Sequence, residues 1–215
     1  MTRVFEVDSH DPDAGADSVR AAADALLEGS LVVIPTETLY GIACRPDLAA
    51  ATARLFAAKR RPADLNLPVL ADTTAAVLAL GLPDDRAVRL AAAFWPGPLT
   101  LVVPRSPRSE RWELGARRGS IALRVPDLPL TTSLLAATGP LAVTSANLSG
   151  LPPLADRNGL VATFGEAVAV YLVMGPDHAA PAGTASTVVD LTEDAFRIRR
   201  LGPISEERIR AVAGR

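Results

Sequence analysis

One lysine stands among the basic residues of this 215-residue chain. Of the 22 Lys and Arg residues only Lys59 is a lysine, and Arg60, Arg61 and Pro62 follow it directly. The ammonium of lysine is a compact, strongly hydrated point charge, whereas the guanidinium of arginine is a planar fork, so the two differ where a phosphate is held. Lys59 is therefore a candidate phosphate ligand. The alternative is a cation that the helix dipole favours at a helix C-terminus, a role that arginine would fill equally well.

Small hydrogen-bonding residues gather at the ends of three apolar segments, in residues 35–41, 144–150 and 183–187. In an extended chain residues i and i+2 share a face, so alternate side chains of a cluster should point the same way. The alternating residues are Thr36, Thr38 and Tyr40 in the first cluster and Ser145, Asn147 and Ser149 in the second. Such positions suit a small polar ligand bound beyond the strand ends. The alternative is that these residues form turns and bond their own backbone.

Two arginines are candidates for holding an anion. Arg124 lies inside the apolar segment 121–125, and a buried arginine needs a partner, so we expect it to reach a cleft. The alternative is a charge that protects an edge strand from aggregation. Arg200 is the weaker candidate, because Arg197 and Arg199 crowd the same segment and all three could form a solvated face.

Composition excludes several classes of protein. The formal net charge of −2 gives no general attraction to nucleic acid. The single cysteine, Cys44, cannot form an internal disulfide and suits a reducing compartment. Neither an apolar leader nor a segment long enough to span a membrane is visible, so we expect a cytoplasmic protein without membrane contact.

Motifs of other chemistries are missing. Neither a P-loop nor a G-x-G-x-x-G sequence occurs in the chain. The only histidines, His10 and His178, lie in segments rich in Asp and Pro, which argues against a histidine metal site or triad. The Trp95–Pro98 segment is typical of a rigid packed turn.

Strands are expected to alternate with helices along the whole chain. The expected strands are 31–35, 67–71, 99–103, 120–125, 141–144, 168–173, 186–191 and 196–200. The expected helices are 16–28, capped by Asp13 or Asp17, 48–59, capped by Asp47, and 73–80, 84–94, 129–138, 156–164 and 205–213. This alternation predicts a single α/β domain over residues 1–215, with a core over about 15–205 and a mixed sheet. The arginine-rich loop 104–119 is the longest irregular stretch and is expected to be mobile.

Six segments in order resemble the YrdC-like threonylcarbamoyl-AMP synthases. They are residues 35–41 (PTETLYG), 59–62 (KRRP), 94–100 (FWPGPLT), 122–126 (ALRVP), 144–150 (TSANLSG) and 186–190 (STVVD). The matches cover nearly the whole chain, and together they are far more specific than any one of them. The resemblance implies a twisted mixed sheet flanked by helices around a concave, positively lined cavity.

The resemblance also implies a reaction and its ligands. L-threonine, bicarbonate and ATP would give threonylcarbamoyl-AMP, pyrophosphate and water, for the threonylcarbamoyladenosine (t6A) modification of tRNA. The residues carried over for threonine are Thr38, Arg124, Ser145 and Ser186. Those carried over for ATP are Lys59, Arg61, Ser120, Asn147 and Arg200, with Lys59 and Arg61 positioning phosphate. No covalent nucleophile is implied.

Cofactor and partners follow from the same resemblance. Mg²⁺ is expected to arrive on the triphosphate and to need no dedicated carboxylate cage. The chain looks like the short form of the family, which would pass its product to a separate threonylcarbamoyl transferase complex and bind tRNA weakly, if at all. Asn66 and Ala185 stand where other members often have proline, which puts local loop geometry in question.

Two other functions stay open at this point. A paralogue of the same fold could bind RNA or a nucleotide without this synthesis, which the arginines of loop 105–118 would favour. The intact Ser145–Asn147 segment argues for the synthase. An enzyme of another carbamoyl transfer would usually carry further modules for which this chain has neither the length nor the cysteines.

Overall fold

The computed structural model describes residues 2–8, 15–175 and 181–214. Both histidines and Asp13 lie outside the described residues. The strands are β1 (Arg3–Val7), β2 (Val32–Ile34), β3 (Gly41–Cys44), β4 (Val69–Leu70), β5 (Leu99–Pro104), β6 (Ser120–Arg124), β7 (Leu141–Ser145), β8 (Val170–Met174), β9 (Thr187–Asp190) and β10 (Arg197–Arg200). The helices are α1 (Ala16–Leu27), α2 (Ala49–Lys59), α3 (Thr74–Leu78), α4 (Asp85–Phe94), α5 (Pro129–Thr138), α6 (Arg157–Phe164) and α7 (Glu206–Ala213).

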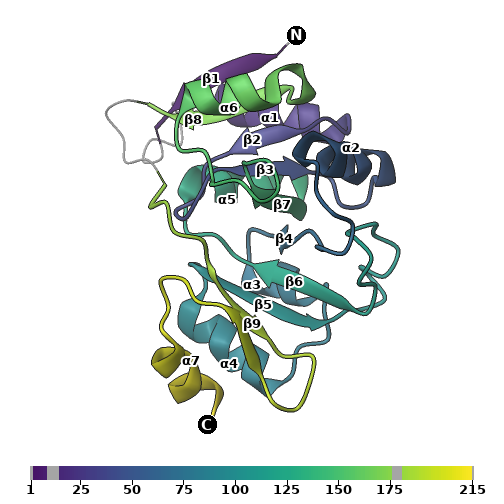
Figure 1. Cartoon of the computed structure of the whole chain (residues 1–215), viewed down its shortest axis with the longest axis vertical. Helices are drawn as coiled ribbons and strands as arrows, with labels where there is room; N and C mark the ends of the chain where they lie inside the picture. Colours follow the sequence, from purple (N-terminus) through teal and green to yellow (C-terminus); the bar gives the residue numbers. More distant parts are fainter. Residues whose placement is uncertain (1, 9–14, 176–180, 215) are drawn as a thin grey trace.

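All the strands described join one mixed sheet in the order β1-β8-β2-β3-β7-β4-β6-β5-β9-β10. The pairs β1·β8, β2·β8, β4·β6 and β5·β9 are parallel, and the other neighbours are antiparallel. The sheet runs along the long axis of the molecule, with β1 towards one end and β9 towards the other (Figure 1). The predicted α/β class with a mixed sheet is confirmed.

Every expected strand and helix is present, but the prediction lacked two strands and misplaced two caps. The edge strand β1 (RVFEV) mixes charged and apolar residues without strict alternation, and β3 was hidden because it follows the polar turn 35–40 directly. Helix α1 is capped by Gly15 and helix α2 by Leu48, in neither case through a side chain. Both carboxylate oxygens of Asp47 instead accept hydrogen bonds from Arg45, so they do not cap the helix.

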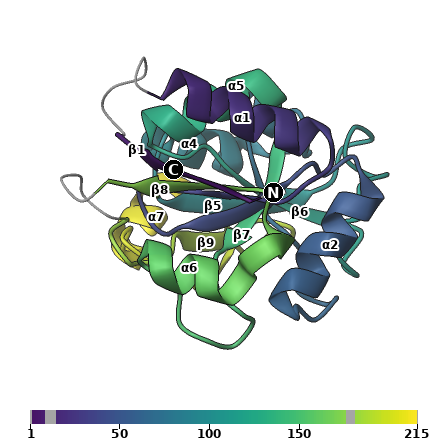
Figure 2. The same cartoon turned by 90° about the horizontal axis from the view of Figure 1, so that it is seen from above.

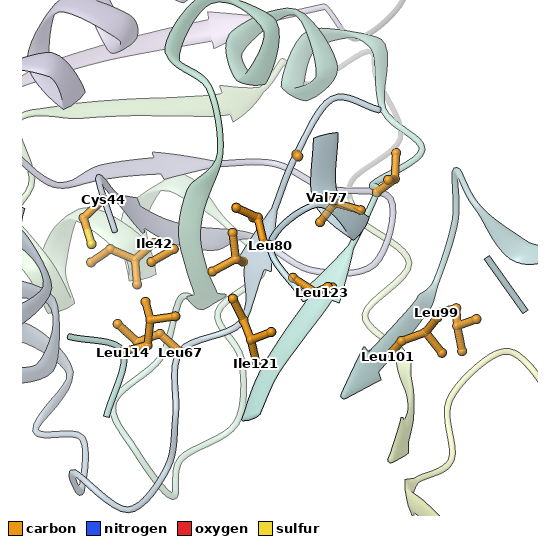
Figure 3. Close-up of a cluster of buried hydrophobic side chains, with 14 of the residues drawn as sticks. Ile42, Cys44, Leu67, Val77, Leu80, Leu99, Leu101, Leu114, Ile121 and Leu123 are labelled. Carbon is orange, nitrogen blue, oxygen red and sulfur yellow. The ribbon is translucent and has the colours of Figure 1, made fainter. Parts of the chain in front are cut away.

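Helices cover both faces of the sheet. Seen along the long axis, α1 and α5 lie together on one side, while α2 and α6 lie on the other (Figure 2). In strands β5 and β6 one face of the sheet is apolar and the other carries polar residues. Alternate residues of β5 and β6 enter the hydrophobic core with Val77 and Leu80 (Figure 3), namely Leu99, Leu101, Ile121 and Leu123. The residues between them therefore point to the opposite face, and this alternation carries polar groups away from the core.

The buried thiol of Cys44 belongs to the same core. Burial raises the pKa of Cys44 to about 12, so the thiol stays protonated at neutral pH. A protonated, enclosed thiol is a poor nucleophile. Cys44 is therefore a core residue.

Loop 104–119 is anchored, which corrects the expectation of a mobile loop. The Ser109 hydroxyl donates to the Leu80 carbonyl at 2.6 Å, and that of Ser106 donates to the Ala79 carbonyl at 2.9 Å. Leu114 is buried, and its carbonyl accepts from the Leu67 amide. The expectation of mobility came from the irregular, arginine-rich sequence of the loop, which could not show these buried anchors.

The Trp95–Pro98 segment forms the packed turn that was predicted. The Trp95 indole donates to the Leu99 carbonyl at 2.7 Å, and its peptide bond to Pro96 is cis. The amide of Gly97 donates to the carbonyl of Val125, which fixes the turn against the end of β6. No described helix has the length and apolarity needed to cross a membrane.

Candidate substrate site

A cavity of about 540 Å³ lies on the sheet face opposite the core described above. Alternate residues of β5 and β6 line it, and its rim comes from the β2–β3 turn, the segment after α2, and the ends of β7, β9 and β10. The predicted site residues that line it are Thr38, Arg61, Ser120, Arg124, Ser145, Asn147, Ser186 and Arg200. Lys59 lines an adjoining pocket of about 440 Å³ instead. The fold therefore brings these residues to one place from strands that are distant in sequence.

The cavity is rich in positive charge. Its described lining contains five arginines and the carboxylate of Asp64. Arg124 and Arg199 form ion pairs with Glu37 and Asp190. The remaining positive charge favours an anionic ligand.

The β2–β3 turn supplies the first polar wall. Residues 35–40 are not extended, because the Thr36 amide donates to the Leu39 carbonyl and closes a turn. Thr36, Thr38 and Tyr40 therefore do not share a face through an extended backbone, as was predicted, although all three line the cavity. The Tyr40 hydroxyl is engaged, because it accepts from the Met174 amide at 2.9 Å.

Hydrogen bonds in this turn fix the direction of the Thr38 hydroxyl. The Thr36 hydroxyl lies 2.6 Å from the Leu39 carbonyl, which can only accept, so the single Thr36 proton is used there. The Thr36 and Thr38 hydroxyl oxygens are 2.9 Å apart, and Thr38 must therefore be the donor of this pair. The lone pairs of Thr38 are left for a ligand. Thr38 thus presents a hydrogen-bond acceptor to the cavity.

Ser145 is oriented in the same way. Its hydroxyl donates to the Asn147 Oδ1 at 2.5 Å, so its lone pairs also remain for a ligand. The Asn147 amide donates to the carbonyls of Leu148 and Leu151 at 2.8 and 2.7 Å. Both hydrogen-bond donations of the Asn147 side chain therefore go to its own loop. The side chain fixes the conformation of this loop and also lines the cavity. Its predicted contact with ATP stays a prediction.

Lys59 ends helix α2, and its ammonium holds the Ser145–Asn147 segment. It donates to the carbonyls of Ser145 and Asn147 and, at 3.4 Å, to the Asn147 Oδ1. The residue is only 1% exposed. Lys59 is thus the cation at a helix end that the alternative described, and it also lies next to Arg61 in the adjoining pocket. Its predicted contact with phosphate stays a prediction.

Burial dominates the electrostatics of the Lys59–Arg61 pair. Desolvation, with the charge of Arg61 as a smaller contribution, lowers the pKa of Lys59 to about 7. Desolvation also lowers the pKa of Arg61. The guanidinium of Arg61 is fixed by the carbonyls of Leu65 and Asn66 at 2.8 and 3.0 Å. Arg61 and the protonated form of Lys59 together are a suitable place for a polyanion.

Arg124 is buried at the end of β6 and is paired with Glu37. Its Nη2 lies 2.6 Å from the Glu37 Oε1, and its Nε donates to the Gly97 carbonyl at 3.1 Å. Strand β6 lies between β4 and β5, so the alternative of an edge-strand charge is wrong. The expectation that Arg124 reaches a cleft is confirmed. Sequence reasoning missed Glu37, whose only signal was its place inside the polar turn.

Arg200 and Ser186 form the opposite wall. The Nε of Arg200 donates to the Ser186 carbonyl at 3.0 Å, and its Nη2 to the Ser186 hydroxyl at 3.2 Å. Burial, and then the nearby charge of Arg124, lower the pKa of Arg200. Arg200 therefore lines the cavity, although Arg197, Arg199 and Arg200 are all exposed, as the alternative of a solvated face requires.

Thr100 is a cavity residue that sequence reasoning missed. Its hydroxyl lies 2.8 Å from that of Ser186, and it is buried. The signal was available, because Thr100 alternates with the core residues Leu99 and Leu101 and so must face the other side.

The two departures from the family pattern both border the cavity. The Asn66 side chain donates to the Arg117 carbonyl at 2.6 Å and accepts from the Arg117 amide at 3.0 Å. Asn66 therefore fixes the chain just before Ser120, which lines the cavity at the start of β6. Ala185 also lines the cavity, and its carbonyl lies against Gly202.

An arginine-lined cavity in a mixed α/β sheet, in a chain without a P-loop, suits a small anionic ligand. A protein-family model named Sua5_yciO_yrdC and described as "Telomere recombination" matches residues 24–202. The chain therefore belongs to the Sua5/YciO/YrdC family, as the six motifs predicted.

Relatives and a solved structure agree with this membership. A protein of Mycobacterium leprae (strain TN), provisionally named a threonylcarbamoyl-AMP synthase, is 44% identical over 217 residues, which cover 100% of this chain and 96% of the relative. The threonylcarbamoyl-AMP synthase of Bacillus subtilis (strain 168) is 33% identical over 211 residues, 97% of this chain and 59% of the relative. P. abyssi Sua5 complexed with L-threonine has a TM-score of 0.82 at 30% identity, covering 100% of this chain and 60% of that one.

Proposed function

We propose that the chain is a threonylcarbamoyl-AMP synthase. One observation carries the proposal: the residues predicted for threonine and for ATP line one cavity, except Lys59, which lines the adjoining pocket. The names of the relatives and the L-threonine complex of P. abyssi Sua5 support the same activity. The product would serve the t6A modification of tRNA, passed on to a separate transferase complex in the cytoplasm.

The chemistry requires no covalent bond to the enzyme. The amine nitrogen of threonine attacks the carbon of CO₂ or bicarbonate, and bicarbonate loses water as the carbamate forms. A carbamate oxygen then attacks the α-phosphorus of ATP, and pyrophosphate leaves. Holding two anions together and neutralising their charge would supply most of the acceleration.

The geometry suggests a task for each wall. We assign the threonine carboxylate to Arg124 and its amine to Thr38 and Ser145, whose hydroxyl lone pairs face the cavity. Arg61 and Arg200 are placed to bind phosphate oxygens, because both guanidiniums are fixed by carbonyls and line the cavity. A pyrophosphate assay with purified protein tests this function. Pyrophosphate release that requires both threonine and bicarbonate is expected, and release no higher than in a threonine-free control would refute it.

The Thr38 hydroxyl gives a test of the assigned acceptor. Thr38→Val keeps the shape but removes the acceptor, and should raise the KM for threonine about tenfold, as expected for one lost hydrogen bond to a charged group. Thr38→Ser keeps the hydroxyl and should stay within a few-fold of the parent protein. Steady-state kinetics with both substrates varied would measure this. Equal KM values for the Val and Ser variants would show that the hydroxyl plays no part.

Mg²⁺ is proposed to enter with the triphosphate. Among the described residues no group of three or more His, Cys, Asp or Glu side chains could hold a metal. Asp64 is the carboxylate that the described cavity lining offers, so triphosphate oxygens and water would supply most ligands. EDTA should therefore abolish pyrophosphate release but leave threonine binding, measured by calorimetry, unchanged. Loss of threonine binding in EDTA would contradict this assignment.

The RNA-binding alternative is not favoured by these relatives. Weak tRNA binding remains a separate expectation, for which filter binding across a salt series is the measurement. Tight, salt-sensitive binding without any turnover of ATP would support the alternative.

A further inference from the structure

Arg124 makes contacts that leave one of its three nitrogens for the cavity. Nε donates to the Gly97 carbonyl and Nη2 to the Glu37 Oε1. Among the described residues none accepts a hydrogen bond from Nη1. The guanidinium is a rigid plane, so fixing two of its nitrogens also fixes the direction of the third.

Both partners of Arg124 are themselves held in place. The Gly97 amide donates to the Val125 carbonyl at 2.9 Å, within the turn that the Trp95 indole fixes. The Glu37 carbonyl accepts from the Ala182 amide at 3.1 Å. Glu37 is not among the described residues that line the cavity, although Arg124 is. The carboxylate therefore contacts the guanidinium from a position outside the cavity lining.

The charge of Glu37 has Arg124 as its partner. Its second oxygen, Oε2, is buried and has no hydrogen-bond partner among the described residues. Arg124 also lies near enough to Arg200 to lower the pKa of that residue. A carboxylate paired with Arg124 offsets the repulsion between these two guanidiniums.

We infer that Glu37 is a positioning residue that aims Arg124 at the carboxylate of threonine, an inference that rests on the proposed function. It acts through Arg124 and does not touch the substrate. Its loss should weaken threonine binding and leave ATP binding nearly intact, because the residues placed for phosphate are held by other groups. A competing role, in which Glu37 occupies Arg124 in place of the substrate, predicts the opposite change.

Calorimetry separates these outcomes. Threonine and a non-hydrolysable ATP analogue would each be titrated into the parent protein, Glu37→Gln and Glu37→Ala. Glu37→Gln keeps the shape and one acceptor, so the dissociation constant of threonine should rise about fivefold. In Glu37→Ala it should rise about tenfold or more. The dissociation constant of the ATP analogue should change less than twofold. Glu113→Gln, which breaks the exposed ion pair to Arg118, is the matched control and should change neither constant.

Three results would overturn the inference. The first is threonine affinity that is unchanged or higher in Glu37→Gln. The second is an equal loss of both ligands together with a lower Tm, which would indicate a merely structural role. The third is a parent protein that binds no threonine and releases no pyrophosphate, which would remove the proposed function as well. If Glu37→Ala does not fold, the Gln variant still decides the question.

Discussion

Replacing Arg124 by alanine is expected to reduce kcat/KM for threonine about 10²–10³-fold, because truncating one partner of a buried hydrogen-bonded charge pair costs about 2–5 kcal/mol. Two effects act together. The substrate carboxylate loses its guanidinium, and the Glu37 carboxylate is left without its ion-pair partner. Threonine-dependent pyrophosphate release measures this. The KM for ATP should change far less than the KM for threonine.

The control for Arg124 is Arg118, an arginine that also forms an ion pair with a glutamate but is exposed and does not line the cavity. Arg118→Ala breaks the exposed pair with Glu113 and should leave both KM values unchanged, since exposed ion pairs contribute little. A KM for threonine within twofold of the parent value in Arg124→Ala would show that the carboxylate binds elsewhere.

Replacing Lys59 by methionine is expected to abolish measurable synthesis and to destabilise the fold. The carbonyls of Ser145 and Asn147 lose their buried donor, at about 1–3 kcal/mol for each unsatisfied group. The loop carrying two cavity side chains is then released. At about 2–4 °C per kcal/mol for a chain of this size, the Tm should fall by roughly 4 °C or more.

The effect of Lys59 on stability should also depend on pH. The pKa of Lys59 in the folded chain, about 7, lies below the ordinary lysine value of 10.5, so between these pH values the unfolded chain binds more protons than the folded one. Stability therefore rises with pH across this window, and the cost of burying the charge is fully present below pH 7. The neutral amine still has two N–H groups for the two carbonyls. Thermal unfolding should show a wider gap between parent and Lys59→Met at pH 9 than at pH 7.

A suitable control lies on the same helix. Arg54→Met removes a cation that donates to the Gly29 carbonyl at 2.8 Å, away from the cavity, and should show no such pH trend. A gap between parent and Lys59→Met that is the same at pH 7 and pH 9 would contradict the account of Lys59.

Much of the fold could be predicted because its signals are local. The segment Leu99–Pro104 alternates core and cavity residues, and Gly or Pro bounds most strands, so their positions follow from a few neighbouring residues. Strand β3 could not be separated from the polar turn before it, because only four residues form it and its first is a glycine. Asp47 was a reasonable cap by type, but an ion pair with Arg45 competed for it.

Most of the cavity lining was predictable, although Thr100 was missed and Lys59 lines the adjoining pocket, but the contacts of these residues were not. Residue types and motif order identified Thr38, Arg124 and Ser186 as cavity residues without showing what they touch. The decisive contacts join distant parts of the chain: 86 residues separate Lys59 from Ser145, and 87 separate Glu37 from Arg124. Such pairings depend on sheet order, which local patterns do not determine. The ion pair of Glu37 with Arg124 and the hydrogen bonds of Lys59 to the Ser145–Asn147 segment could therefore be found only in the folded protein.

A crystal structure with L-threonine and a non-hydrolysable ATP analogue tests the central claim most directly. The account predicts both ligands in the cavity of about 540 Å³, with the threonine carboxylate on Arg124 and phosphate oxygens on Arg61 and Arg200. Threonine bound away from Arg124, or the two ligands on separate surfaces of the molecule, would contradict it.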